Sequence, residues 1–541
     1  MADRPAVMAP FRHETFRLLW LATLVSNLGG LVQSVGAGWM MTTLTQSHNM
    51  IALVQASITL PIMVFSIAAG ALADNFDRRI VMLIAQIGMM AVSLLLAIMA
   101  FMGLLSPWLL LGFTFLIGCG TALFNPSWQA SMGDIVPRED LPGAITLNAM
   151  GFNMMRSVGP AVGGLIVALA GAGAAFAVNA ASYLMLIGVL GRWRPERPQN
   201  RLPREKFASA MWAGIRYVSL SPNLTTVLFR SFLFGFSAIA VLALLPSVAS
   251  DYLGGGALGY GTLLGSFGLG AIGGAFINGR VRERFSNETI VRLACIGFAL
   301  SSGALGLSRD LVLSHLVLLP AGVCWVLTMS LFNVSIQLSS PRWVVGRALS
   351  LYQTATFGGM AVGSWIWGLS ADAWELDAAL VLAGVSMLLC ALVGFRLPLP
   401  QFNALDLNPL NTFNEPVLKL DLQARSGPIL VMIDYVIAQE DIPRFLALMA
   451  ERRHIRIRDG ARQWALLRDL EHPEVWTESY HVPTWIEYLR HNLRRTKADA
   501  ENIELIRALH RGTTPPVVRR MIERQTVPVV DDTPLRDTPE V

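Results

Sequence analysis

Charge is what this sequence has little of. Asp, Glu, Lys and Arg make up 15% of its 541 residues, whereas roughly a quarter is usual in a soluble protein. About half of these charged residues lie after residue 397, so residues 1–397 are poorer still. Because 53% of the chain is hydrophobic, a disordered chain and a plain soluble enzyme are excluded for this first part. We expect a membrane-embedded body followed by a soluble tail.

Cysteine is also scarce, which bears on cofactors. The four cysteines, Cys119, Cys295, Cys324 and Cys390, lie far apart in apolar runs, without a second Cys or a His at a metal-ligand spacing. A disulfide, a metal site or another cofactor is therefore not expected. No small-residue cleavage site closes the first apolar run, so we expect a retained first span and not a signal peptide.

Long apolar runs are what the sequence has instead. A bilayer core about 30 Å thick requires roughly 20 apolar residues per helix. Twelve runs of this kind are separated by polar residues, glycine or proline: residues 18–44, 50–73, 80–103, 107–128, 143–169, 174–192, 223–249, 258–279, 289–307, 311–338, 349–371 and 377–396. The body is therefore predicted to be an all-α membrane protein with twelve transmembrane helices, and the lipid bilayer is its first partner.

The loops between these runs alternate in charge. One set is basic: the N-terminus and the segments at 78–79, 138, 192–206, 280–284 and 342–347. The other set holds Arg309 as its only Lys or Arg. Because cytoplasmic loops carry an excess of Lys and Arg, both termini and the tail should be cytoplasmic in a bacterial inner membrane. This rule accounts for the net charge of +5, and no nucleic-acid partner is expected.

The longest polar interruption, residues 193–222, divides the spans into six and six. Its second part is amphipathic, with Phe207, Met211, Trp212, Ile215 and Val218 on one side. This pattern predicts a linker helix that rests on the cytoplasmic membrane surface; the alternative is a partner-binding helix. The predicted organisation is a first half at 1–192, the linker at 193–222, a second half at 223–397, a connector at 398–428, a soluble α+β domain at 429–525 and a disordered tail at 526–541.

The two halves match each other at an almost constant shift of about 204 residues, which indicates a repeat. The matched pairs include Gly70 with Gly274, Asp74 with Asn278, Arg78 with Arg282, and Gly159 with Gly363. Two six-helix repeats related by an axis along the membrane normal are typical of transporters with a substrate cavity near the bilayer midplane.

The segment GALADNFDRR at residues 70–79 resembles the cytoplasmic signature of the major facilitator superfamily. The resemblance implies that Gly70, Asp74, Arg78 and Arg79 form a charge network that latches the halves in the outward-facing state, with Asn278 and Arg282 as counterparts. Asn75 and Asp77 depart from the usual basic residue and glycine, a departure that suits drug and siderophore exporters. The alternative is a basic turn that simply obeys the topology rule.

The segment RSVGPAVGG at 156–164 resembles part of the antiporter signature of exporters, without its upstream glycines. Pro160 cannot donate to the carbonyl of Arg156, so a kink is expected, and Gly159, Gly163 and Gly164 allow a neighbouring helix to approach closely. The alternative is a purely structural helix contact.

Residues 125–148, the twelve spans and the long tail extend this resemblance to the enterobactin-exporter-like branch, the transmembrane secretion effectors. It implies a secondary active transporter, not an enzyme, that exports siderophore-like, drug-like or other amphipathic metabolites by alternating access. An importer of the same fold is the alternative.

Arg156 lies about 20 Å into its span at 1.5 Å per residue, too deep for its side chain to reach the cytoplasm easily. It should face the central cavity and bind an anionic group of the substrate, or pair with polar neighbours. Arg230 is shallower, and snorkelling is expected. The spans carry no central Asp or Glu, so proton coupling stays open. The other candidate cavity residues are Asn27, Gln33, Gln55, Asn125, Gln129, Asn333, Gln337, Tyr352 and Gln353.

The tail shows a different periodicity. A strand at 429–437, a helix at 440–454, strands at 463–470 and 475–482, helices at 484–495 and 498–511 and an apolar piece at 516–522 give a β-α-β-β-α-β order. This order predicts a ferredoxin-like domain, which resembles the dimeric α/β-barrel domains of antibiotic-biosynthesis monooxygenases. A pocket lined by His454, Trp464, Trp476, Tyr480, His481 and His491 would suit an enzyme or sensor; the alternative is a regulatory or self-associating domain.

Overall fold

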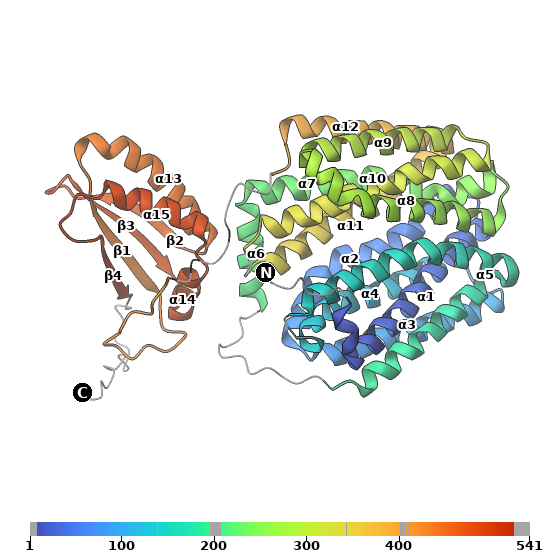
Figure 1. Cartoon of the computed structure of the whole chain (residues 1–541), viewed down its shortest axis with the longest axis horizontal. Coiled ribbons are helices and arrows are strands. Elements are labelled where there is room, and N and C mark those ends of the chain that lie inside the picture. Colours follow the sequence, from blue (N-terminus) through green and yellow to red (C-terminus); the bar gives the residue numbers. More distant parts are fainter. Residues whose placement is uncertain are drawn as a thin grey trace. The chain divides into compact units, whose positions relative to one another are not determined.

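In the computed structural model the chain forms two units, drawn together in Figure 1. The structure describes residues 8–137, 139–194, 207–341, 343–400 and 412–523, together with residues 407 and 410. The first unit comprises Met1–Phe207, Thr226–Ile336 and Leu349–Gln401, and the second Ala208–Thr225, Gln337–Ala348 and Phe402–Val541. The predicted disordered tail at 526–541 lies outside the described residues.

Five helices make up the first half of the first unit. They are α1 (Glu14–Leu44), α2 (His48–Asn75), α3 (Arg78–Phe101), α4 (Pro107–Ile135) and α5 (Leu141–Arg192). α5 carries two of the predicted spans, and the φ of 79° and ψ of 169° at Gly171 break its helical path between them. A glycine is needed there, because residues with a Cβ rarely adopt this conformation.

Six further helices form the second half. They are α7 (Pro222–Ser247), α8 (Gly256–Arg284), α9 (Asn287–Leu307), α10 (Leu311–Leu338), α11 (Val345–Trp374) and α12 (Leu376–Arg396), and a π-helical turn at Val248–Tyr252 follows α7. The predicted apolar runs fall on these helices. In the described part of the chain, ten helices are long and apolar enough to cross a membrane, so a multi-pass helical membrane protein is confirmed.

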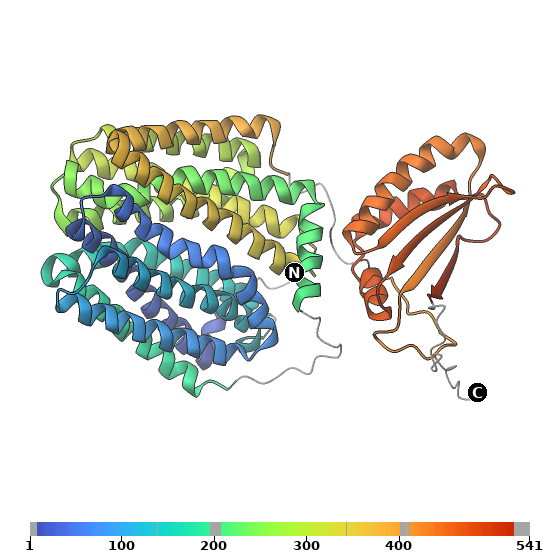
Figure 2. The same ribbon diagram turned by 180° about the vertical axis from the view of Figure 1, so that it is seen from behind.

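Within each half, neighbouring helices pack along one another. α1 lies along α5, α2 along α4, and α9 along α12, as the view in Figure 2 also shows. Val32, Leu96, Leu110 and Phe176 meet in the core of the first half. Large apolar side chains also lie on the outside of the bundle, with Leu169 at 79% exposure among them. An outer surface of this kind is unfavourable in water and is expected against lipid.

The second unit contains an antiparallel sheet in the order β2-β3-β1-β4. Its elements are β1 (Ile429–Val436), α13 (Ile442–Arg458), β2 (Arg462–Arg468), β3 (Val475–Val482), α14 (Trp485–Leu493), α15 (Lys497–Leu509) and β4 (Val517–Ile522). Alternate residues of β1 and β3 are buried. They pack against apolar residues of the three helices, so the helices cover one face of the sheet. The predicted order of strands and helices in the tail is confirmed.

A helix is present within the predicted linker, α6 (Phe207–Ser219), and its position on the membrane surface stays a prediction. Trp212 is 68% exposed, whereas Gly214, Tyr217 and Val218 are buried. Tyr217 packs edge-on against Trp343 in the segment between α10 and α11, with ring centroids 5.3 Å apart. The helix is therefore oriented by contacts with its own chain, which the amphipathic pattern alone did not reveal.

Candidate functional site

The glycines of the 156–164 segment hold α5 against two neighbours. A Cβ at Gly159 would lie 2.8 Å from the Cβ of Leu31 in α1, and one at Gly164 would lie 2.7 Å from the Cα of Gly261 in α8. Pro160 lies inside the same helix. Because α8 belongs to the second half, Gly164 lies where the two halves touch backbone to backbone.

A second contact between the halves joins α2 to α11. The Oγ of Ser66 lies 2.9 Å from the Oγ1 of Thr354, which also donates to the carbonyl of Met63 at 3.3 Å. Further along, the carboxylate of Asp372 accepts from the backbone N–H of His48 at 2.6 Å and from Ser47 Oγ at 2.7 Å. Asp372 thus caps the first turn of α2 from the opposite half.

Arg156 points from α5 toward the second half. Its guanidinium carbon lies 5.4 Å from the ring centroid of Trp325 in α10, within reach of a cation–π contact. Among the described residues, Trp325 is its only recorded partner, and no carboxylate neutralises it. The side chain is partly exposed. The arrangement fits a cation available to an anion between the halves.

Two of the predicted cavity residues instead hold helices together. Gln33 is 4% exposed, and its Oε1 accepts from Ser93 Oγ at 2.8 Å and from the amide of Asn179, which join α1, α3 and α5. Tyr352 is buried, and its hydroxyl donates to the carbonyl of Met329 at 3.4 Å. Both positions are therefore structural.

The remaining residues predicted to line the cavity are either exposed or partly exposed. Asn125, Gln129 and Gln337 are exposed, and Asn27, Gln55, Asn333 and Gln353 are partly exposed. Gln337 belongs to the second unit and not to the bundle. The others stay candidates for contact with a substrate.

The predicted latch is described in part. The surroundings of Gly70 and the side chain of Asp74 lie outside what the structure describes. Arg78 donates to Asp134 of α4 at 2.8 Å, and Arg79 donates to the carbonyls of Leu190 and Gly191 at 2.8 and 2.6 Å. These contacts join helices of the same half.

The counterpart region of the second half is also tied together. Asn278 donates to Ser330 Oγ at 3.0 Å, and Arg282 is engaged in further contacts. Arg292 of α9 donates to the carbonyl of Gly394 near the end of α12 at 3.1 Å. Arg79 and Arg292 thus each donate to a carbonyl near the end of the last helix of their half.

The snorkelling prediction for Arg230 is wrong. The residue is fully buried and pairs with Glu288 at the start of α9. Glu288 also accepts from Arg292 Nε at 2.8 Å and from the backbone N–H of Leu399 at 2.9 Å. Sequence reasoning missed Glu288 because it lies just before the apolar run at 289–307, outside the span searched for carboxylates.

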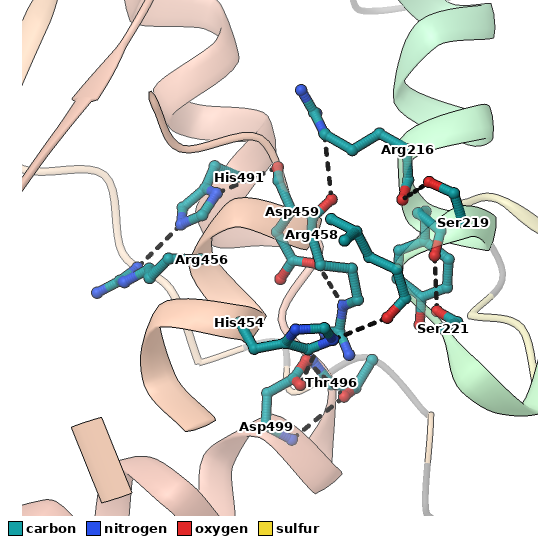
Figure 3. Close-up of polar contacts among 12 residues, drawn as sticks. Arg216, Ser219, Ser221, His454, Arg456, Arg458, Asp459, His491, Thr496 and Asp499 are labelled. Carbon is teal, nitrogen blue, oxygen red and sulfur yellow. Dashed lines mark hydrogen bonds and ion pairs between the residues drawn. The ribbon is translucent and has the colours of Figure 1, made fainter. Parts of the chain in front are cut away.

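In the second unit, α6 is bound to the sheet-containing domain (Figure 3). His454 of α13 donates through Nε2 to the carbonyl of Leu220 at 2.7 Å. Arg216 donates to the carbonyl of Arg458 at 3.4 Å, and the guanidinium of Arg458 lies 4.9 Å from the ring centroid of Tyr217. The linker between the two halves is thus a docking surface for the domain.

The residues predicted to line a pocket in the tail are only partly brought together. Trp464 and Tyr480 lie close to Glu478, and His491 lies against Tyr480 with ring centroids 5.6 Å apart. His454 instead contacts α6, and His481 lies 3.9 Å from Glu523. Trp476 packs against Phe445 in the core.

Comparison with known proteins decides the family. Residues 5–526 match the model of the transmembrane secretion effector family. The chain belongs to this family. This transmembrane secretion effector is 28% identical over 414 residues to the enterobactin exporter EntS of Shigella flexneri, with 73% of this chain and 96% of that protein covered. The enterobactin exporter of Escherichia coli (strain SMS-3-5 / SECEC) is 27% identical over 412 residues, with the same shares covered.

Solved structures show the fold of this transmembrane secretion effector. A bacterial homologue of the human lysosomal transporter Spinster matches with a TM-score of 0.55 at 15% identity, over 71% of this chain and 95% of that one. A D-xylose-proton symporter matches with a TM-score of 0.57 at 14% identity, over 72% and 98%. The chain therefore has the fold of the major facilitator transporters. It is a multi-pass secondary transporter for a small molecule and not an enzyme.

Proposed function

We propose that this chain exports siderophore-like or other amphipathic metabolites across the bacterial inner membrane by alternating access. The observation that carries the proposal is the alignment with 96% of the Shigella flexneri enterobactin exporter. The contacts of Gly164 with Gly261, of Ser66 with Thr354 and of Asp372 with the start of α2 support a bundle of two halves in contact. Rocking of the halves about these contacts would open the cavity to either side in turn.

The proposed bundle has twelve spans. Gly171 divides α5 into two segments, each long enough to cross the membrane, and α11 adds a span to those identified by hydropathy. An even number of spans and the basic loops support a cytoplasmic position for both termini.

The proposed cargo carries a negative charge. Arg156 is an uncompensated cation among the described residues and lies against Trp325, so an acidic, partly aromatic metabolite would find a charge partner and a ring to stack on. Asn27, Gln55, Asn125, Gln129, Asn333 and Gln353 are proposed to complete the cavity with hydrogen bonds. Proton coupling is part of the proposal, because the fold also serves a D-xylose-proton symporter.

We further propose that a charge network at the cytoplasmic edge acts as the latch between the two halves. Gly70, Asp74, Arg78 and Arg79, with Asn278 and Arg282 in the other half, would bias the outward-facing state. The pairing of Arg78 with Asp134 supports a network at this edge.

The tail is proposed to be a ferredoxin-like domain that regulates transport or associates with a second copy. The sheet order β2-β3-β1-β4 supports the fold. The face opposite the helices holds partly exposed Leu430 and Met432 beside exposed Leu467 and Met521, which supports self-association.

Transport into inverted membrane vesicles, with and without a pH gradient, tests direction and coupling together. A siderophore such as enterobactin should accumulate in the vesicles, and an acid interior should increase the amount. Arg156→Ala should reduce accumulation at least tenfold, and Arg156→Lys should retain most of it. Accumulation only in right-side-out vesicles would establish an importer, and equal transport by Arg156→Ala would refute the anionic site.

A further inference from the structure

The C-terminal domain has an unusual excess of buried positive charge between its sheet and its helices. Arg452 and Arg456 of α13 are 4% and 1% exposed, and partly exposed Arg495 follows α14. Arg452 and Arg456 pair with Glu478 of β3, which is fully buried. From these groups we infer that the domain binds a small oxyanion, a carboxylate or a phosphate, at Arg452, Arg456 and Arg495.

Glu478 is already fully engaged. Its oxygens accept from Arg456 Nε at 3.0 Å, Trp464 Nε1 at 3.1 Å and the hydroxyl of Tyr435 at 3.2 Å, and Arg452 Nε lies 3.7 Å away. Burial opposes ionisation, and Arg456 and Arg452 outweigh it, lowering the pKa of Glu478 to about 2. Glu478 thus pairs with Arg452 and Arg456, and Arg495 adds a third positive charge that interacts with both. One negative charge therefore stands against three positive ones.

The nearby His491 is uncharged, so it neither balances the arginines nor adds to their positive charge. Arg456 donates through Nη1 to His491 Nε2 at 2.9 Å, so this nitrogen carries no proton. Nδ1 donates to the carbonyl of Asp459 at 3.3 Å. Burial and the arginines Arg456 and Arg495 keep the pKa of His491 well below its ordinary value. The ring is therefore neutral.

The carboxylates of Asp459, which follows α13, and of Asp499 in α15 pair with another arginine. Asp459 and Asp499 both pair with Arg458, at 3.0 and 2.8 Å. Their charges are therefore directed toward Arg458, on the side of the domain that meets α6. They leave the excess at Arg452, Arg456 and Arg495 unbalanced.

The arginines also present free donors. Arg452 Nε, Arg456 Nη2 and Arg495 Nε are buried without a hydrogen-bond partner in the described part of the chain. A buried donor without a partner is unfavourable, and an unpaired buried charge is more so. An oxyanion would accept from these donors and balance the excess charge, and hydrogen bonds between a guanidinium group and an oxyanion are among the stronger ones in proteins. Partly exposed Arg495 places one edge of this cluster near the surface.

The test measures anion binding to the full chain in detergent by isothermal titration calorimetry. Sodium phosphate and sodium succinate are titrated separately, with sodium chloride keeping the ionic strength constant. At least one should bind saturably, and the pair of titrations distinguishes a phosphate site from a carboxylate site. Arg452→Gln and Arg495→Gln should each weaken binding about tenfold or more. Arg453→Gln removes an exposed charge from the same helix and should leave binding unchanged.

Two readouts keep the result independent of folding. Hydrogen exchange of the wild-type chain should slow across α13 and α14 when the anion is added, and it should not change in Arg495→Gln at the same concentration. Absence of saturable binding of both anions to the wild type would overturn the inference. Equal weakening by Arg453→Gln would also overturn it, because binding would then follow surface charge. If Arg452→Gln fails to fold, Arg495→Gln decides.

Discussion

The contact between Gly164 and Gly261 gives a residue-scale test of the interface between the halves. A Cβ at Gly164 would lie 2.7 Å from the Cα of Gly261. This contact is with the backbone, so a change of side-chain rotamer cannot relieve it. Gly164→Val should therefore separate α5 from α8, lower thermal stability by about 1–3 kcal/mol and abolish transport.

Gly188→Val is the matched control for this change. Gly188 lies in the same helix, and its Cβ would meet no atom within 4 Å. Thermal unfolding in detergent and vesicle transport report both properties. Normal transport by Gly164→Val would show that the close approach of α5 and α8 is dispensable.

His491 makes a residue-scale prediction about pH. Its pKa is held well below 6.5 in the folded domain by burial and by Arg456 and Arg495, whereas the unfolded chain has the ordinary value. Below about pH 6.5, His491 therefore binds a proton in the unfolded state and stays unprotonated in the folded state. Stability should decrease by up to about 1.4 kcal/mol per pH unit from there until the folded pKa is reached.

Hydrogen exchange of peptides from α13 and α14 in the full chain, at pH 7.5 and 5.5, measures this loss. His491→Gln should flatten the dependence, because the amide does not titrate. His472→Gln is the control, since His472 is largely exposed and lies away from the arginines. An undiminished pH dependence in His491→Gln would assign the effect to other groups.

At the scale of elements, Asp372 caps a helix that belongs to the other half. The cap of α2 exists only while the two halves meet at this end, because Asp372 is in α11. Replacing an N-terminal cap costs about 0.5–2 kcal/mol. In Asp372→Ala that cost falls on the closed arrangement alone, so the population open at this end should rise about two- to thirty-fold.

Spin labels on the first turn of α2 and the last turn of α11, read by double electron–electron resonance, would measure that shift. Asp310→Ala is a suitable control, because Asp310 caps α10 within its own half through the N–H of Leu313. It should lower stability without changing the distance distribution. An unchanged distribution in Asp372→Ala would show that the cap does not contribute to closure.

The elements were largely predictable, because spacing and apolar length are properties of the sequence. The helices of the body and the β-α-β-β-α-β order of the tail follow periodicity, and the repeat follows the constant shift. Partnerships across the fold were not predictable in this way. Arg230 was expected to snorkel to the membrane surface. Its partner Glu288 could not be recognised from the sequence, because it is 58 residues away. Gln33 and Tyr352 are polar like a cavity residue, and three-dimensional contacts assign them to helix packing.

At the scale of the whole molecule, about a quarter of the chain lies outside the alignment with the enterobactin exporters, while the family model extends to residue 526. The chain is therefore longer than the exporters it aligns with, and the family model includes the C-terminal domain. Its docking on α6 places it on the linker through which the chain passes from one half to the other.

This docking predicts an effect of the domain on turnover. Arg216→Ala with His454→Ala removes two hydrogen bonds to α6, and loss of these restraints should raise the transport rate while leaving the apparent affinity for cargo unchanged. The matched control is Arg453→Ala, an exposed change on the same helix as His454. Rates in proteoliposomes at saturating cargo measure the effect. A change in affinity at constant rate would place the domain's influence at the cavity, and an unchanged rate would mean that the linker moves with the domain attached.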